Sequence, residues 1–138
     1  MGSFQERFYQ NFIQDDRWRY LWDGLYVTLE VTLLATLIGI LLGFIVAIIR
    51  STHDRTGKFR ILNALCQVYL TVIRGTPVVV QLLIIYFVIF GSMNVSKVLV
   101  AVLAFGVNSG AYVAEICRAG IMSIDIGQME AGRSIGFS

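Results

Sequence analysis

The stretch that decides the fold runs from Val31 to Ile49 and reads V-T-L-L-A-T-L-I-G-I-L-L-G-F-I-V-A-I-I, without a charged side chain. A bilayer core is about 30 Å thick and a helix rises about 1.5 Å per residue, so about 20 apolar residues are needed to cross it. The stretch meets that length. We therefore expect an all-α chain with its first membrane span over residues 25–49.

The composition of the whole chain is typical of a membrane protein. Of its 138 residues, 57% are hydrophobic and 14% are charged, whereas soluble domains carry about a quarter charged residues. The net charge of +2 is too small to indicate nucleic acid as a partner. Cys66 and Cys117 lie in apolar stretches without the spacing of a metal site or a disulfide framework, so we expect two packed thiols and no metal.

An aromatic segment precedes the first span. Tyr and Trp favour the headgroup region of a membrane, so we expect residues 1–24 to form an interfacial helix that lies against the bilayer. Within the span, Gly39 and Gly43 are spaced so that another helix can approach closely. The aromatic residues of the segment are Phe4, Phe8, Tyr9, Phe12, Trp18, Tyr20 and Trp22.

Basic residues set the orientation of the first span. The short loop that follows it contains Arg50, Arg55, Lys58 and Arg60 against a single acid, Asp54. Loops rich in Lys and Arg stay in the cytoplasm. We therefore expect this loop inside and the N-terminus outside.

The next apolar stretch, residues 61–90, is about 45 Å long if fully helical, which is too long for one straight span. The sequence Arg74-Gly75-Thr76-Pro77 interrupts it. Pro77 suits the first turn of a helix, with Thr76 as the N-cap, so we expect one helix over residues 62–73 and another over 77–90. An interrupted backbone at membrane depth survives only where protein or a water-filled cavity surrounds it.

A third span is expected over residues 98–117, followed by a cytoplasmic segment, 118–138. Asn108, Tyr112 and Glu115 are spaced by four and three residues and share one helix face, with Ser109 beside them. Asn108 lies about 15 Å into the span. Because polar stripes in membrane helices face the bundle or a cavity, these residues are candidates for a solute path. The alternative is interhelical hydrogen bonding, worth about 0.6 kcal/mol per bond.

Arg74 is the other candidate for the path. Its guanidinium group has three options: a solute carboxylate, Glu115, or the inner membrane surface, which a long side chain can reach. Glu115 in turn has Arg118 one helical turn away as an alternative partner. We find no H-E-x-x-H, G-x-S-x-G or G-x-x-x-x-G-K-[ST] motif and expect neither catalysis nor ATP binding by this chain.

Three segments together resemble one protein family. The string Glu130-Ala131-Gly132-Arg133-Ser134-Ile135-Gly136, with Gly127-Gln128 before it, resembles the cytoplasmic coupling loop of bacterial ABC-importer permeases, with Gly132 in place of the usual second alanine. Two further segments resemble the permeases for polar amino acids. They are Arg74-Gly75-Thr76-Pro77 with Gln81, and Asn108-Ser109-Gly110-Ala111-Tyr112 with Glu115, Arg118 and Gly120.

The resemblance implies that residues 1–138 are the N-terminal part of one permease domain, an incomplete five-helix fold truncated inside the coupling loop. It implies a multi-pass protein of the bacterial cell membrane, in contact with lipid. It further implies three protein partners: an ATPase that binds the ATP, an extracytoplasmic solute-binding protein, and a second permease subunit, identical or different. The alternative is a small helical membrane protein that regulates a partner without transport of its own.

The resemblance also implies two sets of functional residues. The expected path residues are Arg74, Thr76, Asn108, Ser109, Tyr112 and Glu115. The expected ATPase-coupling residues are Gln128, Glu130, Ala131, Gly132, Arg133 and Gly136.

Overall fold

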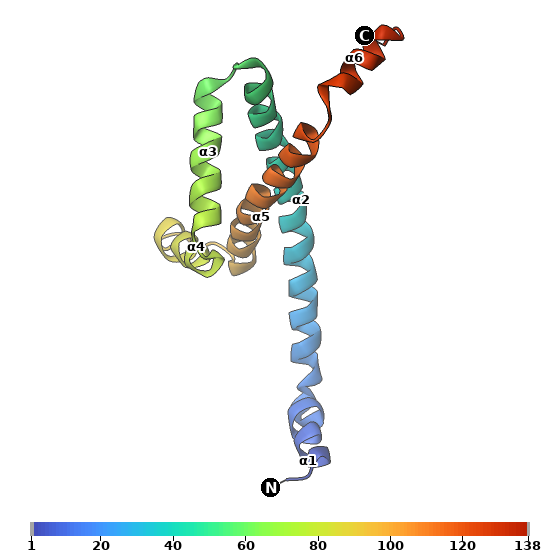
Figure 1. The fold of residues 1–138 in the computed structure, drawn as a ribbon. Coiled ribbons are helices and arrows are strands. Elements are labelled where there is room, and N and C mark those ends of the chain that lie inside the picture. Colours follow the sequence, from blue (N-terminus) through green and yellow to red (C-terminus); the bar gives the residue numbers. More distant parts are fainter. Residues whose placement is uncertain (1, 138) are drawn as a thin grey trace.

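A computed structural model describes residues 2–137, and all regular structure in that part of the chain is helical (Figure 1). Met1 and Ser138, the outermost residues of the expected interfacial segment and coupling loop, lie outside the described residues. The elements are α1 (Phe4–Phe8), a π-helical turn η1 (Tyr9–Ile13), a 3-10 turn η2 (Gln14–Asp16), α2 (Trp18–Thr56), α3 (Arg60–Gly75), α4 (Val78–Ile84), a π-helical turn η3 (Ile85–Ile89), α5 (Lys97–Met122) and α6 (Ile126–Ser134).

Two helices are long and apolar enough to cross a membrane, α2 with 39 residues and α5 with 26. The segments 60–75 and 78–89 form a third span if the bent pair is counted as one, with an angle of 109° between them. The three apolar segments expected from the sequence are therefore present, and the second is broken as predicted.

Helix α2 extends beyond the predicted bounds 25–49 at both ends. At 39 residues it is about 58 Å long, and the bilayer core accounts for about 30 Å of that length. The expected interfacial helix is shorter than residues 1–24, because α2 already begins at Trp18. Asp15 and Asp16, with φ of 58° and 54°, separate α1 and η1 from it. Contact of this segment with the membrane surface stays a prediction.

Helices α2 and α5 cross in close contact (Figure 1). A Cβ atom added at Gly43 would lie 2.5 Å from Val113 Cγ1, and one at Gly39 would lie 2.7 Å from Ser109 Cβ. The close approach predicted from these two glycines is therefore confirmed. Helix α5 contributes a matching pair of glycines, Gly106 and Gly110, at the same crossing.

A core cluster of buried residues lies where α3 packs against α2 and α5. It consists of Val46, Cys66, Leu70, Ala111 and Ala114. Cys66 is buried there and is a packed thiol, as expected. The Tyr69 hydroxyl of α3 donates a hydrogen bond to the Val107 carbonyl of α5, which adds a polar contact at the edge of this core.

The turn between α2 and α3 and the C-terminal helix α6 lie at the same end of the molecule, opposite the N-terminus (Figure 1). Gly57 ends α2 in the left-handed conformation, with φ of 72°. This arrangement agrees with the predicted topology, in which the basic loop and the segment after the third span share the cytoplasmic side.

Candidate functional site

Two extended residues interrupt the second apolar segment between α3 and α4. Helix α3 ends at Gly75, Thr76 and Pro77 are extended, and α4 begins at Val78. The prediction that Thr76 caps the second helix is wrong, since α4 has no side-chain cap. The Thr76 hydroxyl instead donates to the Val72 carbonyl at 2.8 Å, within the last turn of α3. Because Pro77 is itself extended, Thr76 lies one residue too early to cap α4.

The side chain of Gln81 in α4 forms hydrogen bonds with the residues of this interruption. Its Nε2 donates to the Ile73 carbonyl at 2.7 Å, to the Thr76 carbonyl at 3.1 Å and to Thr76 Oγ1 at 2.7 Å. The last carbonyls of a helix lack intrahelical partners and need others when buried. Gln81 is buried and supplies such a partner to the end of α3. In the sequence, Gln81 stands out only through the family resemblance, because its contacts form only when α4 folds back against the end of α3.

Asn108 connects α5 to the same interruption. Its Nδ2 donates to Gln81 Oε1 at 3.3 Å. Asn108 therefore faces the other helices, and it forms the interhelical hydrogen bond that was the alternative to lining a path. Its part in a solute path stays a prediction.

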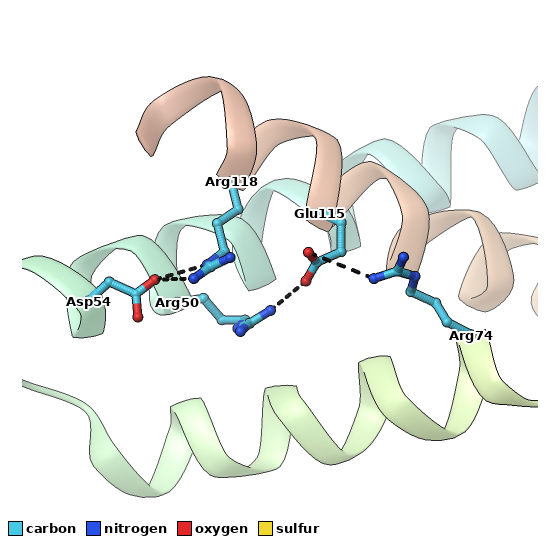
Figure 2. Close-up of polar contacts among 5 residues, drawn as sticks. All are labelled: Arg50, Asp54, Arg74, Glu115 and Arg118. Carbon is cyan, nitrogen blue, oxygen red and sulfur yellow. Dashed lines mark hydrogen bonds and ion pairs between the residues drawn. The ribbon is translucent and has the colours of Figure 1, made fainter. Parts of the chain in front are cut away.

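Glu115 of α5 lies between two guanidinium groups (Figure 2). Its Oε1 is 2.5 Å from Arg50 Nη1, and its Oε2 is 3.7 Å from Arg74 Nη1. The Arg74 guanidinium also lies 5.7 Å from the centroid of the Tyr112 ring. Of the three alternatives for Arg74, the structure therefore has the pair with Glu115. Arg50 was counted only among the basic residues that set the topology.

Arg118 pairs with Asp54 of α2 and not with Glu115, which corrects the local alternative. Its Nε and Nη2 donate to Asp54 Oδ2 at 2.9 and 2.6 Å (Figure 2). The physical reason is that α2 presents Arg50 and Asp54 one turn apart. Opposite charges on α2 and α5 therefore match between the helices.

The charges of this network do not cancel. It contains the three arginines 50, 74 and 118 against the two acids 54 and 115, an excess of one positive charge. The excess lies on the side of Arg74, because 46% of its side chain is exposed, against 13% for Arg50. Unlike the Arg50 contact, the Arg74 contact with Glu115 is too long for a hydrogen bond.

Ser109 does not join the other expected path residues. It packs against α2 beside Gly39 and lines a separate cleft of about 450 Å³ with Thr32 and Phe105. Successive residues on a helix are rotated by about 100°, so Ser109 faces away from Asn108. The structure thus gathers five of the six around Gln81 and Arg50: Arg74, Thr76, Asn108, Tyr112 and Glu115.

The expected coupling residues lie on and just after the short helix α6. Asp125 caps this helix, since its Oδ1 accepts from the Gly127 amide at 3.0 Å. Gly136 follows with φ of 92°, where only glycine is readily accommodated. No residue of α6 is buried. A short helix with a glycine turn behind it is therefore present and accessible.

Residues 39–138 match the family described as binding-protein-dependent transport system inner membrane components. The chain belongs to this family. Membership agrees with the helical membrane fold and with a place in the inner membrane. It favours a part in transport over the regulatory alternative.

Individual members of this family share sequence with the chain. The glutamine transport system permease protein GlnP of Escherichia coli K12 is 43% identical over 81 residues, which are 56% of this chain and 37% of that protein. The L-cystine transport system permease protein TcyB of Bacillus subtilis is 46% identical over 86 residues, 61% of this chain and 36% of that protein. The nopaline transport system permease protein NocM of Agrobacterium fabrum is 38% identical over 98 residues, 61% of this chain and 39% of that protein.

A solved structure shares the fold. It is described as the crystal structure of an amino acid ABC transporter with histidines, and it matches 80% of this chain with 42% identity and a TM-score of 0.67. The match covers 50% of that chain. This inner membrane component therefore spans about a third to a half of the length of the relatives it matches.

Proposed function

We propose that this chain forms part of the translocation path of an ABC importer for polar amino acids and couples that path to a separate ATPase. The chemistry of the known relatives supports the substrate class, because they are named as permeases for glutamine, L-cystine and nopaline. The ATP is bound and hydrolysed by the partner, and the chain itself is a transport component without catalysis.

The observation that carries the proposal is the exposed guanidinium of Arg74 beside the interrupted backbone, in a network that has one excess positive charge. A free amino acid carries a carboxylate and an ammonium group. Arg74 is exposed and only loosely held by Glu115, so it is available to a solute carboxylate, and guanidinium groups recognise carboxylates well. Glu115 offers the complementary negative charge. Asn108, Tyr112 and Thr76 supply hydrogen-bonding groups nearby.

Helix α6 serves the coupling. Its side chains are exposed at the cytoplasmic end, so it is free to dock in a groove of the ATPase. In this proposal Glu130 and Arg133 provide charged contacts and Gln128 a polar one, while Ala131 and Gly132 permit close approach and Gly136 turns the chain. On the outer side, a solute-binding protein delivers the amino acid. A second permease subunit, identical or different, completes the path within the lipid.

The path is tested by Asn108→Leu in the permease assembled with its partners in vesicles. We expect uptake of the amino acid to fall while the amount of assembled complex is unchanged. The control is Ser109→Ala, on the neighbouring face of α5, which is expected to leave uptake unchanged. Normal uptake kinetics in Asn108→Leu would assign Asn108 a structural role only.

The coupling is tested by Glu130→Arg in the same assembly. Reversing this charge is expected to abolish the stimulation of ATP hydrolysis by solute while the protein stays in the membrane. Gln10→Arg introduces the same side chain on exposed η1 at the opposite end of the molecule and is the matched control. Unchanged stimulation in Glu130→Arg would contradict a coupling role for α6.

A further inference from the structure

Helix α6 makes few contacts with the rest of the bundle. It follows α5 after a connection of three residues, 123–125, and none of its own residues is buried. A cleft of about 460 Å³ lies between the end of α2 and this junction, with Ile48 and Arg55 on one side and Ile121 and Met129 on the other. Apolar packing therefore does not fix the direction in which α6 leaves α5.

Arg55 of α2 bridges this cleft. Its Nη1 is 3.5 Å from Met129 Sδ of α6, and its Nη2 donates to the Ile121 carbonyl at 3.0 Å. Within residues 2–137, the contact with Met129 is the one side-chain hydrogen bond that joins α6 to a helix other than itself. Ile121 lies in the last turn of α5, where carbonyls lack intrahelical partners. A cation at a helix C-terminus is also favoured by the helix dipole.

Asp54, the residue before Arg55, contacts α5 one turn before Ile121. Asp54 accepts two hydrogen bonds from Arg118, and Arg118 and Ile121 are one helical turn apart. Asp54 and Arg55, two consecutive residues of α2 with opposite charge, therefore both form hydrogen bonds with the last turns of α5. Further into the membrane, the close approach at Gly43 locks the same two helices together.

We propose that Arg55 is a positioning residue for the coupling helix. It fixes the angle between α6 and the bundle and joins α6 to α2 as well as to α5. A displacement of α6 by its partner then moves both helices together, and not α5 alone. This inference rests on the proposed coupling role of α6, although the positioning itself is a geometric property that can be measured separately.

The geometric test measures the distance between spin labels at Ile45 of α2 and Ser134 of α6, in the assembled permease with Cys66 and Cys117 replaced by alanine. We expect a narrow distance distribution in the parent and a broad one in Arg55→Ala. Arg55→Lys, whose single ammonium group cannot span both acceptors, is expected to lie between them. Lys58→Ala removes the same charge three residues later and is expected to match the parent. Equal distributions in Arg55→Ala and the parent would overturn the proposal.

The functional test compares solute-stimulated ATP hydrolysis in Arg55→Ala, Lys58→Ala and Glu130→Arg. We expect Arg55→Ala to lower the stimulation by about fivefold, the low end of typical coupling between sites, and Lys58→Ala to retain it. If Glu130→Arg keeps full stimulation, the coupling role of α6 fails, and the label distances alone decide whether Arg55 positions the helix. If Glu130→Arg loses stimulation while Arg55→Ala keeps it, the positioning role is refuted.

Discussion

Glu115 Oε1 of α5 lies 2.5 Å from Arg50 Nη1 of α2, although the two residues are 65 positions apart in the sequence. The same carboxylate is the counter-ion of Arg74 on α3. One acid therefore connects three helices. Because removing charges from water is costly, such a pair specifies an arrangement more than it adds stability, and the loss of one partner leaves the other uncompensated.

Glu115→Gln removes the negative charge that Arg50 and Arg74 share. We expect the free energy of unfolding of the detergent-purified chain to fall by about 2 kcal/mol, as is typical when a charged hydrogen bond is lost. The thermal unfolding midpoint measures this change.

Glu30→Gln is the matched control for that measurement. Glu30 lies on α2 and forms no ion pair within residues 2–137. We expect its midpoint to stay at that of the parent. Equal midpoints for Glu115→Gln and Glu30→Gln would show that the network contributes nothing to the fold.

Gly43→Ala is expected to separate α2 from α5. The added Cβ would lie 2.5 Å from Val113 Cγ1 and 3.0 Å from the Ala114 amide nitrogen, so backbone has to move. We expect a loss of about 1–3 kcal/mol, read as a lower unfolding midpoint. Gly24→Ala in the same helix meets no atom within 4 Å and is expected to stabilise by up to about 1 kcal/mol. The prediction fails if both substitutions shift the midpoint in the same direction.

Gln81→Leu tests how the interruption between α3 and α4 is held. The substitution leaves the Ile73 and Thr76 carbonyls without their Nε2 partner, at a cost of about 1–3 kcal/mol for a buried group. We expect amide hydrogen exchange to become faster over residues 73–81 and to stay unchanged in α2. Gln67→Leu, on α3 but outside these contacts, is the control. Protection equal to that of the parent would show that Gln81 does not hold the interruption.

Tyr69 and Gly110 are expected to be energetically coupled. A Cβ at Gly110 would lie 2.9 Å from the Tyr69 hydroxyl oxygen and 3.0 Å from Leu42 Cδ2. We expect Gly110→Ala to destabilise the chain less when Tyr69→Phe has already removed the hydroxyl, although the contact with Leu42 keeps part of the cost. A double-mutant cycle of unfolding free energies measures this, with a coupling of about 0.5 kcal/mol or more. Additive effects would contradict the contact.

Local signals predicted the interruption well, whereas the pairing of the charges could not be predicted. Gly75 and Pro77 both disfavour a continuous helix. The break between residues 74 and 77 could therefore be found from the local sequence alone. The partner of Glu115 could not, because Arg118 is near in sequence while Arg50 becomes near only after α2 and α5 have packed. The bounds of α2 were also missed, since polar and aromatic ends can continue a helix beyond the membrane.

The sequence alone determined that the chain is helical and lies in a membrane, and where its second span breaks; the cytoplasmic side of its basic loop stays a prediction. These properties follow from the length of apolar runs, from the distribution of charge and from the backbone limits of glycine and proline, all of which act over a few residues. Only the tertiary structure decided that Ser109 turns toward α2 while Asn108 reaches Gln81, and that Arg55 joins α6 to α2. Those contacts depend on how helices rotate and cross, which is set by close packing between segments distant in the chain.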